Sequence, residues 1–358
     1  MRTIIKIAAA AVTLPLALLT APAATAASPA AKQVTCGSEV QGRVVLTRDL
    51  NCTGPGLIVK TSGTTIDLNG HTLRHAGGTA EWNVPGITVG YYSDDYTRTD
   101  DVTIRNGRIE GYVYAVEAVF TERLTVEGLG TPNAISSGYS GGLTVRNSRI
   151  DGGVGLDYHG AALIEKNHLG SAGGRGGGIT IRNNVFTDRG VNLYEGGDSQ
   201  VTGNRFTGSG GIALGDSIRK VTVEGNSVQG ALTGITLYGI WLEDIEIRNN
   251  RIRNSGWSGI LVADDAQSVH DVLIEGNKVT HSGFGPYGDW EGAAPTPPGI
   301  RVAASSVEGD ARDVTLRGNR VRSSAGHGIF APGGTDGGGN RASGSKVQPD
   351  CVGVTCRR

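Results

Sequence analysis

A short pattern recurs along the chain: a β-branched run, a polar residue, Gly or Asn, then Asn and one more apolar residue. It reads IRNNVF at 181–186, EGNSV at 224–228 and RGNRV at 317–321. The copies return about every 20 residues, with insertions between some of them, which indicates a solenoid of stacked repeats. The period is too short for paired-helix repeats, and the sequence has no 3.6-residue pattern.

A second pattern, Gly, Ile or Val, any residue, then an apolar residue, precedes each copy. It reads GVNL at 190–193, GIAL at 211–214 and GITL at 234–237. Alternation within such a strand puts its apolar residues on one face. Three short strands per turn, stacked coil on coil, predict an all-β protein: a parallel β-helix of about a dozen coils.

The repeated Asn is expected to be structural. Stacked coils lie about 4.8 Å apart, so equivalent residues sit above one another. Asn tolerates a left-handed turn, and its amide can bond to the Asn of the next coil. The column is Asn167, Asn184, Asn204, Asn226, Asn250, Asn277, Asn319 and Asn340.

These repeats resemble the right-handed parallel β-helix repeats of the pectin-lyase-like superfamily. GTTIDLNGHTL at 63–73 is similar to the first coil of secreted bacterial members. The resemblance covers almost all of the mature chain and implies a right-handed coil. It also implies activity on polysaccharides, as a lyase, a polygalacturonase-type hydrolase or a uronan epimerase, although a fold does not fix a function.

The two ends of the chain predict export. Residues 1–27 combine Arg2 and Lys6, a short apolar run and an Ala-x-Ala site, as in a secretory signal peptide. The four cysteines pair most simply as Cys36 with Cys52 and Cys351 with Cys356. We therefore expect an N-terminal cap at 28–56, the β-helix at 57–342 and a disulfide-closed tail at 343–358.

The overall charge limits the partners. The formal net charge is −1, and no basic helix or charge block is present, so nothing favours nucleic acid. No apolar stretch is long enough for a good membrane span. We expect an exported monomer whose partner is an extracellular polysaccharide.

Candidate site residues follow the Gly-Ile strands. The fourth residue after the Ile or Val is Tyr158, Arg175, Glu195, Asp216 and Asp264 in different coils, and Asp157, Tyr194 and Tyr238 occupy the position before it. Glu195 and Asp216, one coil apart, fit an acid–nucleophile pair or a Ca²⁺ site. The alternative is that both are turn residues facing water.

Elimination from a uronate sugar needs a cation for the carboxylate, a base for the neighbouring proton and an acid for the leaving oxygen. Arg175 fits the first role. His159 and the tyrosines Tyr158, Tyr194 and Tyr238 fit proton transfer. His159 in LDYHG is also typical of an ordinary surface residue.

Aromatic residues in the connections predict a sugar-binding wall. Trp257 precedes one Gly-Ile strand, and the long connection at 280–298 contains Tyr287 and Trp290. The same loop is equally compatible with a cover packed over neighbouring coils.

The leading hypothesis is a secreted polysaccharide lyase. The main alternative is a non-catalytic carbohydrate-binding or cell-envelope protein, and an epimerase or a glycoside hydrolase is a further possibility.

Overall fold

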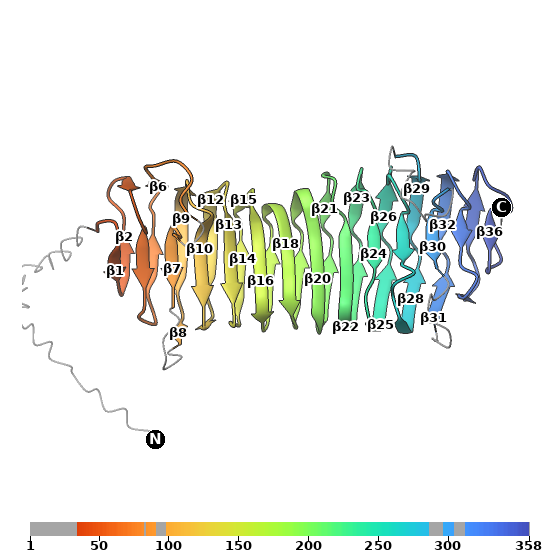
Figure 1. Ribbon diagram of the computed structural model, residues 1–358, viewed down its shortest axis with the longest axis horizontal. Coiled ribbons are helices and arrows are strands. Elements are labelled where there is room, and N and C mark those ends of the chain that lie inside the picture. Colours follow the sequence, from red (N-terminus) through yellow and green to blue (C-terminus); the bar gives the residue numbers. More distant parts are fainter. Residues whose placement is uncertain (1–33, 82–83, 91–97, 286–295, 304–311, 358) are drawn as a thin grey trace, which may run out of the picture. The chain divides into compact units, whose positions relative to one another are not determined.

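The computed structural model describes residues 34–81, 84–90, 98–285, 296–303 and 312–357. The predicted signal segment at 1–27 lies outside these residues. Successive turns of the chain form coils that stack along one axis, and the strands of each coil pair in parallel with those of the next (Figure 1). The predicted parallel β-helix is confirmed.

Each coil contributes to three faces, joined by turns. The first face holds β1 (Ser38–Val40), β4 (Leu57–Val59), β7 (Ile87–Val89), β10 (Tyr114–Val119), β13 (Ala134–Gly138), β16 (Gly153–His159), β24 (Ile235–Leu237), β27 (Ile260–Val262), β30 (Ile300–Val302), β33 (Ile329–Phe330) and β36 (Cys351–Val352). The second face holds β2 (Arg43–Val45), β5 (Thr65–Asp67), β14 (Leu143–Arg146), β17 (Ala162–Glu165), β19 (Ile179–Arg182), β25 (Trp241–Arg248), β28 (Ser268–Glu275), β31 (Arg312–Arg317) and β34 (Thr335–Asp336).

The third face holds β3 (Leu50–Cys52), β6 (Thr72–His75), β15 (Arg149–Ile150), β21 (Arg205–Phe206), β23 (Ser227–Gln229), β26 (Arg251–Arg253), β29 (Lys278–Ser282), β32 (Arg320–Ser324) and β35 (Arg341–Ser343). Five longer strands bend from one face to another: β9 (Thr103–Glu110), β12 (Thr125–Thr131), β18 (His168–Gly176), β20 (Val185–Thr202) and β22 (Ile212–Glu224). The short strands β8 (Thr99–Asp100) and β11 (Thr121–Glu122) pair beside the stack.

The apolar residues of the Gly-Ile pattern fill the interior. In β22, Ile212 and Leu214 are buried while Ala213 between them is partly exposed. Ile212 pairs with Val191 in one neighbouring coil and with Ile235 in the other. Full burial of such a side chain stabilises the fold by about 1.5–3 kcal/mol, so the stacked columns supply the main driving force.

The coils extend beyond the predicted boundaries. β1 pairs with β4 inside the predicted cap, and β36 pairs with β33 inside the predicted tail. These end strands lack the Asn pattern, so the repeat alone could not reveal them. Both predicted disulfides are present: Cys36–Cys52 with Cα atoms 5.5 Å apart and Cys351–Cys356 with Cα atoms 6.0 Å apart.

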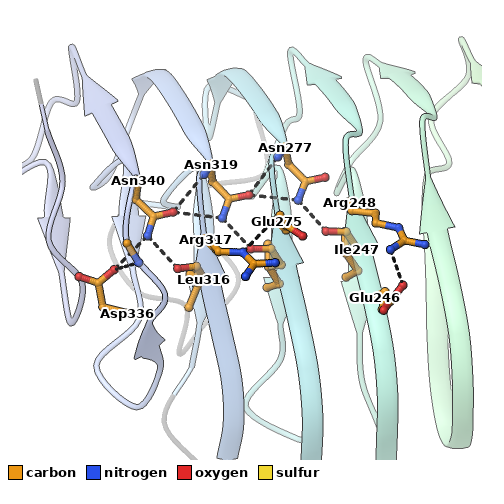
Figure 2. A network of polar contacts seen from close by, with 12 residues as sticks. Glu246, Ile247, Arg248, Glu275, Asn277, Leu316, Arg317, Asn319, Asp336 and Asn340 are labelled. Carbon is orange, nitrogen blue, oxygen red and sulfur yellow. Dashed lines mark hydrogen bonds and ion pairs between the residues drawn. The ribbon is translucent and has the colours of Figure 1, made fainter.

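The Asn column lies in the turn between the second and third faces and forms a continuous buried ladder, of which Figure 2 shows Asn277, Asn319 and Asn340. The Oδ1 of Asn319 accepts from the backbone N–H of Asn277 at 3.0 Å and from its Nδ2 at 3.1 Å. Nδ2 of Asn319 donates to the carbonyl of Ile274 at 2.8 Å. One expectation is corrected: the left-handed residue is the one before each ladder Asn, for example Asn249 at φ 56° and Gly318 at φ 65°.

A column of charges runs beside this ladder on the second face. Signs alternate from coil to coil except at one Thr: Asp67, Arg105, Glu127, Arg146, Glu165, Arg182, Thr202, Glu224, Arg248, Glu275 and Arg317. Each Arg bonds to the acid of the preceding coil at 2.7–3.4 Å, as Arg317 does to Glu275 in Figure 2. The charged side chains on this part of the face therefore form ion pairs with one another.

Candidate functional site

A groove of about 730 Å³ runs along the first face. Its floor is made by the outward positions of successive strands: Ser136, Gly155, Gly173, Asn192, Ala213 and Thr236. Most of these side chains are small or absent, so the backbone of the sheet is left uncovered. One wall is formed by connections that contain Arg189, Ser209 and Leu232, and the other by the turn that contains Asp157 and Tyr194. A shallow groove along stacked strands suits an extended chain.

The turn between the first and second faces, which we call the groove edge, brings most predicted site residues together. It contains Asp157, Tyr158, Arg175, Tyr194, Glu195, Asp216 and Tyr238. The structure places Arg175 level with Tyr194, one position earlier than the sequence alignment gave. The register shifts here because Leu156 pairs with Gly174 but His159 pairs with Gly176. The coil that contains Arg175 is therefore one residue shorter at this turn than the preceding coil.

Arg175 is the centre of the groove edge. Its guanidinium lies over the rings of Tyr158 and Tyr194, at 5.1 and 5.6 Å from their centroids. Nη1 donates to the hydroxyl of Tyr158 at 2.6 Å, and Nε lies 3.4 Å from a carboxylate oxygen of Glu195. Partial burial opposes its charge, but Glu195 and the tyrosine hydroxyls hold the pKa of Arg175 above its ordinary value. A fixed cation thus borders the groove.

The aromatic column continues toward the N-terminal coils. The rings of Phe120 and Tyr139 stack at 5.7 Å, and those of Tyr139 and Tyr158 at 5.3 Å. All three residues have positive φ, between 45° and 51°, which is uncommon for bulky side chains. The stack covers one side of Tyr158 while Arg175 covers the other, so the aromatic column limits how Arg175 can move.

Glu195 and Asp216 occupy equivalent positions in consecutive coils. Glu195 follows Tyr194 and Asp216 follows Gly215, and these two preceding residues pair with each other. Both acids have positive φ, 49° for Glu195 and 58° for Asp216. The Tyr238 ring lies over Gly215, where a Cβ would come within 2.1 Å of it. Its hydroxyl donates to Oδ1 of Asn192, two coils away, at 3.1 Å. Burial raises the pKa of Tyr238, so its hydroxyl stays protonated at neutral pH.

His159 does not face the groove. It is 3% exposed, with Nδ1 2.8 Å from the carbonyl of Gly160 and Nε2 3.1 Å from the hydroxyl of Ser137. Burial lowers the pKa of His159. The expectation of a proton-transfer group at the surface is corrected: its ring anchors the turn that follows Tyr158.

Two other candidates, Asp264 and Trp257, lie beyond the coils that line the groove. Asp264 is two coils beyond Asp216, and its carboxylate accepts from Arg301 at 3.1 and 3.2 Å. Trp257 is partly buried, and its backbone N–H donates to the carbonyl of Leu232, one coil beyond the groove wall. Tyr287 and Trp290 lie outside the described residues.

Sequence reasoning missed two contributors, Asn192 and Gly215. Gly215 stands in the column that holds Tyr194 and Tyr238. A glycine that interrupts an aromatic column is a signal that could have found them, because the ring of a neighbouring coil can occupy the space above the glycine.

Within the described residues, no group of three or more His, Cys, Asp or Glu side chains could hold a metal ion, so the predicted Ca²⁺ has no cluster of this kind there. No helix in the same residues is long and apolar enough to cross a membrane.

Comparison with known proteins supports the fold. Residues 133–294 match the family described as "Right handed beta helix region". No curated protein matches the chain.

Solved structures with a similar coil include the A-module of a mannuronan C-5 epimerase from Azotobacter vinelandii, at 14% identity and a TM-score of 0.45, covering 87% of this chain and 89% of that one. A polygalacturonase from Erwinia carotovora has 13% identity and a TM-score of 0.45, covering 91% and 98%. An alginate lyase from Paenibacillus sp. has 12% identity and a TM-score of 0.31, covering 90% and 91%. The parallel coils of the described residues and the match to this family together show the fold, a right-handed parallel β-helix.

Proposed function

We propose that this protein is exported, binds a uronate-containing polysaccharide in the groove of the first face and cleaves it by β-elimination. The observation that carries the proposal is Arg175, held at the groove edge between two phenols and beside the Glu195 carboxylate. The predicted signal segment and the two disulfides favour an oxidising, extracellular setting.

The chemistry assigns one role to each group. Arg175 pairs with the substrate carboxylate and so favours loss of the proton on the adjacent carbon. The Glu195 carboxylate accepts that proton, the carbon–carbon double bond forms, and the glycosidic carbon–oxygen bond breaks. Tyr194, which lines the groove, donates its hydroxyl proton to the leaving oxygen. Asp157, Tyr158, Asp216 and Tyr238 would contact the sugar units on either side.

The test is incubation with pectate, alginate, hyaluronan, chondroitin and heparosan, with and without Ca²⁺, while the ultraviolet absorbance of unsaturated uronate is followed. The variants are Arg175→Ala, Tyr194→Phe and the double change Glu195→Gln with Asp216→Asn. Arg182→Gln on the second face is the matched control. Product from one polymer, lost in the first three variants and kept in the control, supports elimination at this site. Absence of product from every polymer contradicts it.

A second function, binding without cleavage, is favoured by one observation. Arg175 and Glu195 already pair with each other, and Arg175 also bonds to Tyr158, so the groups form a satisfied structure without substrate. Retention of the protein by an acidic polymer, with neither unsaturated product nor new reducing ends, would identify a carbohydrate-binding protein. New reducing ends without unsaturation would instead indicate a hydrolase.

A further inference from the structure

A second hollow, of about 580 Å³, lies on the other side of the groove edge, on the second face. Its lining residues come from successive coils and include Gly196, Gly197, Asp198, Arg219, Trp241 and Glu243. Trp241 is 47% exposed, which is unusual for tryptophan, because its side chain has the largest apolar surface of any residue type. The groove chemistry uses none of these side chains.

Trp241 closes one end of this hollow. Trp241 pairs with Ser217 of the preceding coil. All other residues that line the hollow belong to the coil of Trp241 or to coils that precede it in the chain. On the opposite side, in the next coil, the ring of His270 lies 5.6 Å from the indole centroid. The His270 ring, tilted by 44°, thus lies against the indole from the next coil, while the hollow lies toward the preceding coils.

The floor of the hollow has little side chain to occupy it. A Cβ on Gly196 would lie 1.7 Å from the carbonyl oxygen of Gly176, and one on Gly197 would lie 2.6 Å from that of Arg219. The close approach of neighbouring backbones therefore requires glycine at both positions. The consequence is a bare floor several coils long, spaced at about 4.8 Å per coil, beside an exposed aromatic face.

The rim offers hydrogen-bonding groups. The indole N–H of Trp241 donates to Glu243 at 3.2 Å, which fixes the ring in place. Asp198, Glu243 and Arg219 surround the hollow, so carboxylates outnumber the cation among the lining residues. An aromatic face with polar groups at its border suits a sugar ring, and the excess of carboxylates disfavours an acidic one.

We propose that this hollow binds a neutral pyranose ring of a polysaccharide, stacked on the free face of Trp241. The site depends on the proposed function only in taking carbohydrate as the ligand. It lies on a different face from the groove and takes a different class of sugar. The protein would then hold a neutral polymer while the groove acts on an acidic one.

The test is affinity electrophoresis of the purified protein in gels that contain laminarin or dextran, with pectate as the acidic comparison. Trp241→Ala is expected to weaken retardation by a neutral polymer about tenfold, because one stacking surface is lost. Trp257→Phe, a partly buried Trp outside the hollow, and Arg175→Ala in the groove edge are expected to bind neutral polymer like the wild type. Thermal unfolding checks that each variant is folded.

The proposal would be overturned if neither laminarin nor dextran retarded the wild-type protein. It would also be overturned if Trp241→Ala were retarded as strongly as the wild type. The groove is judged separately, by product formation from acidic polymers. A protein that binds laminarin through Trp241 but yields no unsaturated product would keep this site and contradict the proposed lyase.

Discussion

In several coils, two turns pass through the same left-handed backbone but use it differently. In the Asn turn the positive-φ position is held by Gly, Asn or Lys, and the next residue is a buried Asn that repeats with little change. At the groove edge the equivalent left-handed position holds Tyr158, Glu195, Asp216 and Gly239 in different coils. One turn repeats its residues and the other varies them.

The difference separates a turn with a structural role from a turn that is free to vary. The ladder amides donate and accept within the stack, so every coil needs the same residue (Figure 2). At the groove edge no such repetition is required, and a bulky or charged residue at positive φ adds local strain. The variable turn is therefore where a binding or catalytic site is expected, and five predictions test this contrast.

The largest effect is expected in the Asn ladder. Asn250→Ala removes a side chain that bonds to both neighbouring coils and to the carbonyl of Val223. Buried donors and acceptors would be left unsatisfied, which should lower the free energy of unfolding by about 3 kcal/mol. Asn249→Gly changes the adjacent exposed residue at φ 56° and is expected to stay within about 0.5 kcal/mol. Urea unfolding of the two variants measures the contrast. Equal losses in the free energy of unfolding would contradict a special role of the ladder Asn.

Next is the loss of the cation at the groove edge. Arg175→Ala should lower the rate of product formation about 100-fold, because the substrate carboxylate loses its partner. Arg175→Lys should recover little, since a lysine cannot reproduce the planar contact between two rings. The thermal midpoint should change little in both. A large drop in that midpoint would mean that this turn, like the Asn turn, serves stability.

A smaller effect is expected from Gly215→Ala. The added Cβ would come within 2.1 Å of the Tyr238 ring and displace it, which breaks the hydrogen bond to Asn192. We expect about a tenfold loss of polymer affinity, measured by affinity electrophoresis, because a displaced ring no longer borders the groove. Tyr238→Phe removes only the hydroxyl and should lose less. The reverse order would show that the hydrogen bond matters more than the position of the ring.

The charge column should contribute less. Arg182→Gln leaves Glu165, whose side chain is 13% exposed, without its ion pair at 2.8 Å. The expected cost is about 1 kcal/mol, reduced at high salt because exposed pairs are screened. Urea unfolding at low and high ionic strength measures it, with Lys220→Gln as a control, since Lys220 lies 4.0 Å from the exposed Asp198. A loss that salt does not change would point to packing rather than charge.

The smallest expected effect is a dependence on pH. Burial depresses the pKa of His159 below its ordinary value of 6.5, so the unfolded chain binds this proton more readily than the folded one. The stability from the neutral ring is complete above the unfolded pKa and is lost as pH falls from there toward the folded pKa. His159→Gln should flatten the change in thermal midpoint between pH 7.5 and 5. An unchanged slope would assign the dependence to other groups.

Much of the fold could be predicted from the sequence, because its order is local and repeated. The period near 20, the apolar alternation and the Asn column each follow from residues within one coil, and stacking only copies them. The end coils escaped prediction because β1 and β36 carry too few repeat residues to be recognised. The disulfides were predictable because each joins the nearest cysteine in the chain.

By itself, then, the sequence determined the coil, its interior and the turn that varies from coil to coil. Only the tertiary structure decided which groups the varying residues contact. It moved Arg175 level with Tyr194 through one shortened turn, buried His159, and paired Asp264 with Arg301. It also opened a hollow beside Trp241, whose floor has no room for a Cβ at Gly196 and Gly197. The physical reason is that inward residues are fixed by burial within their own coil, whereas outward residues are fixed by neighbours about 20 residues away, whose register shifts with each inserted or missing residue.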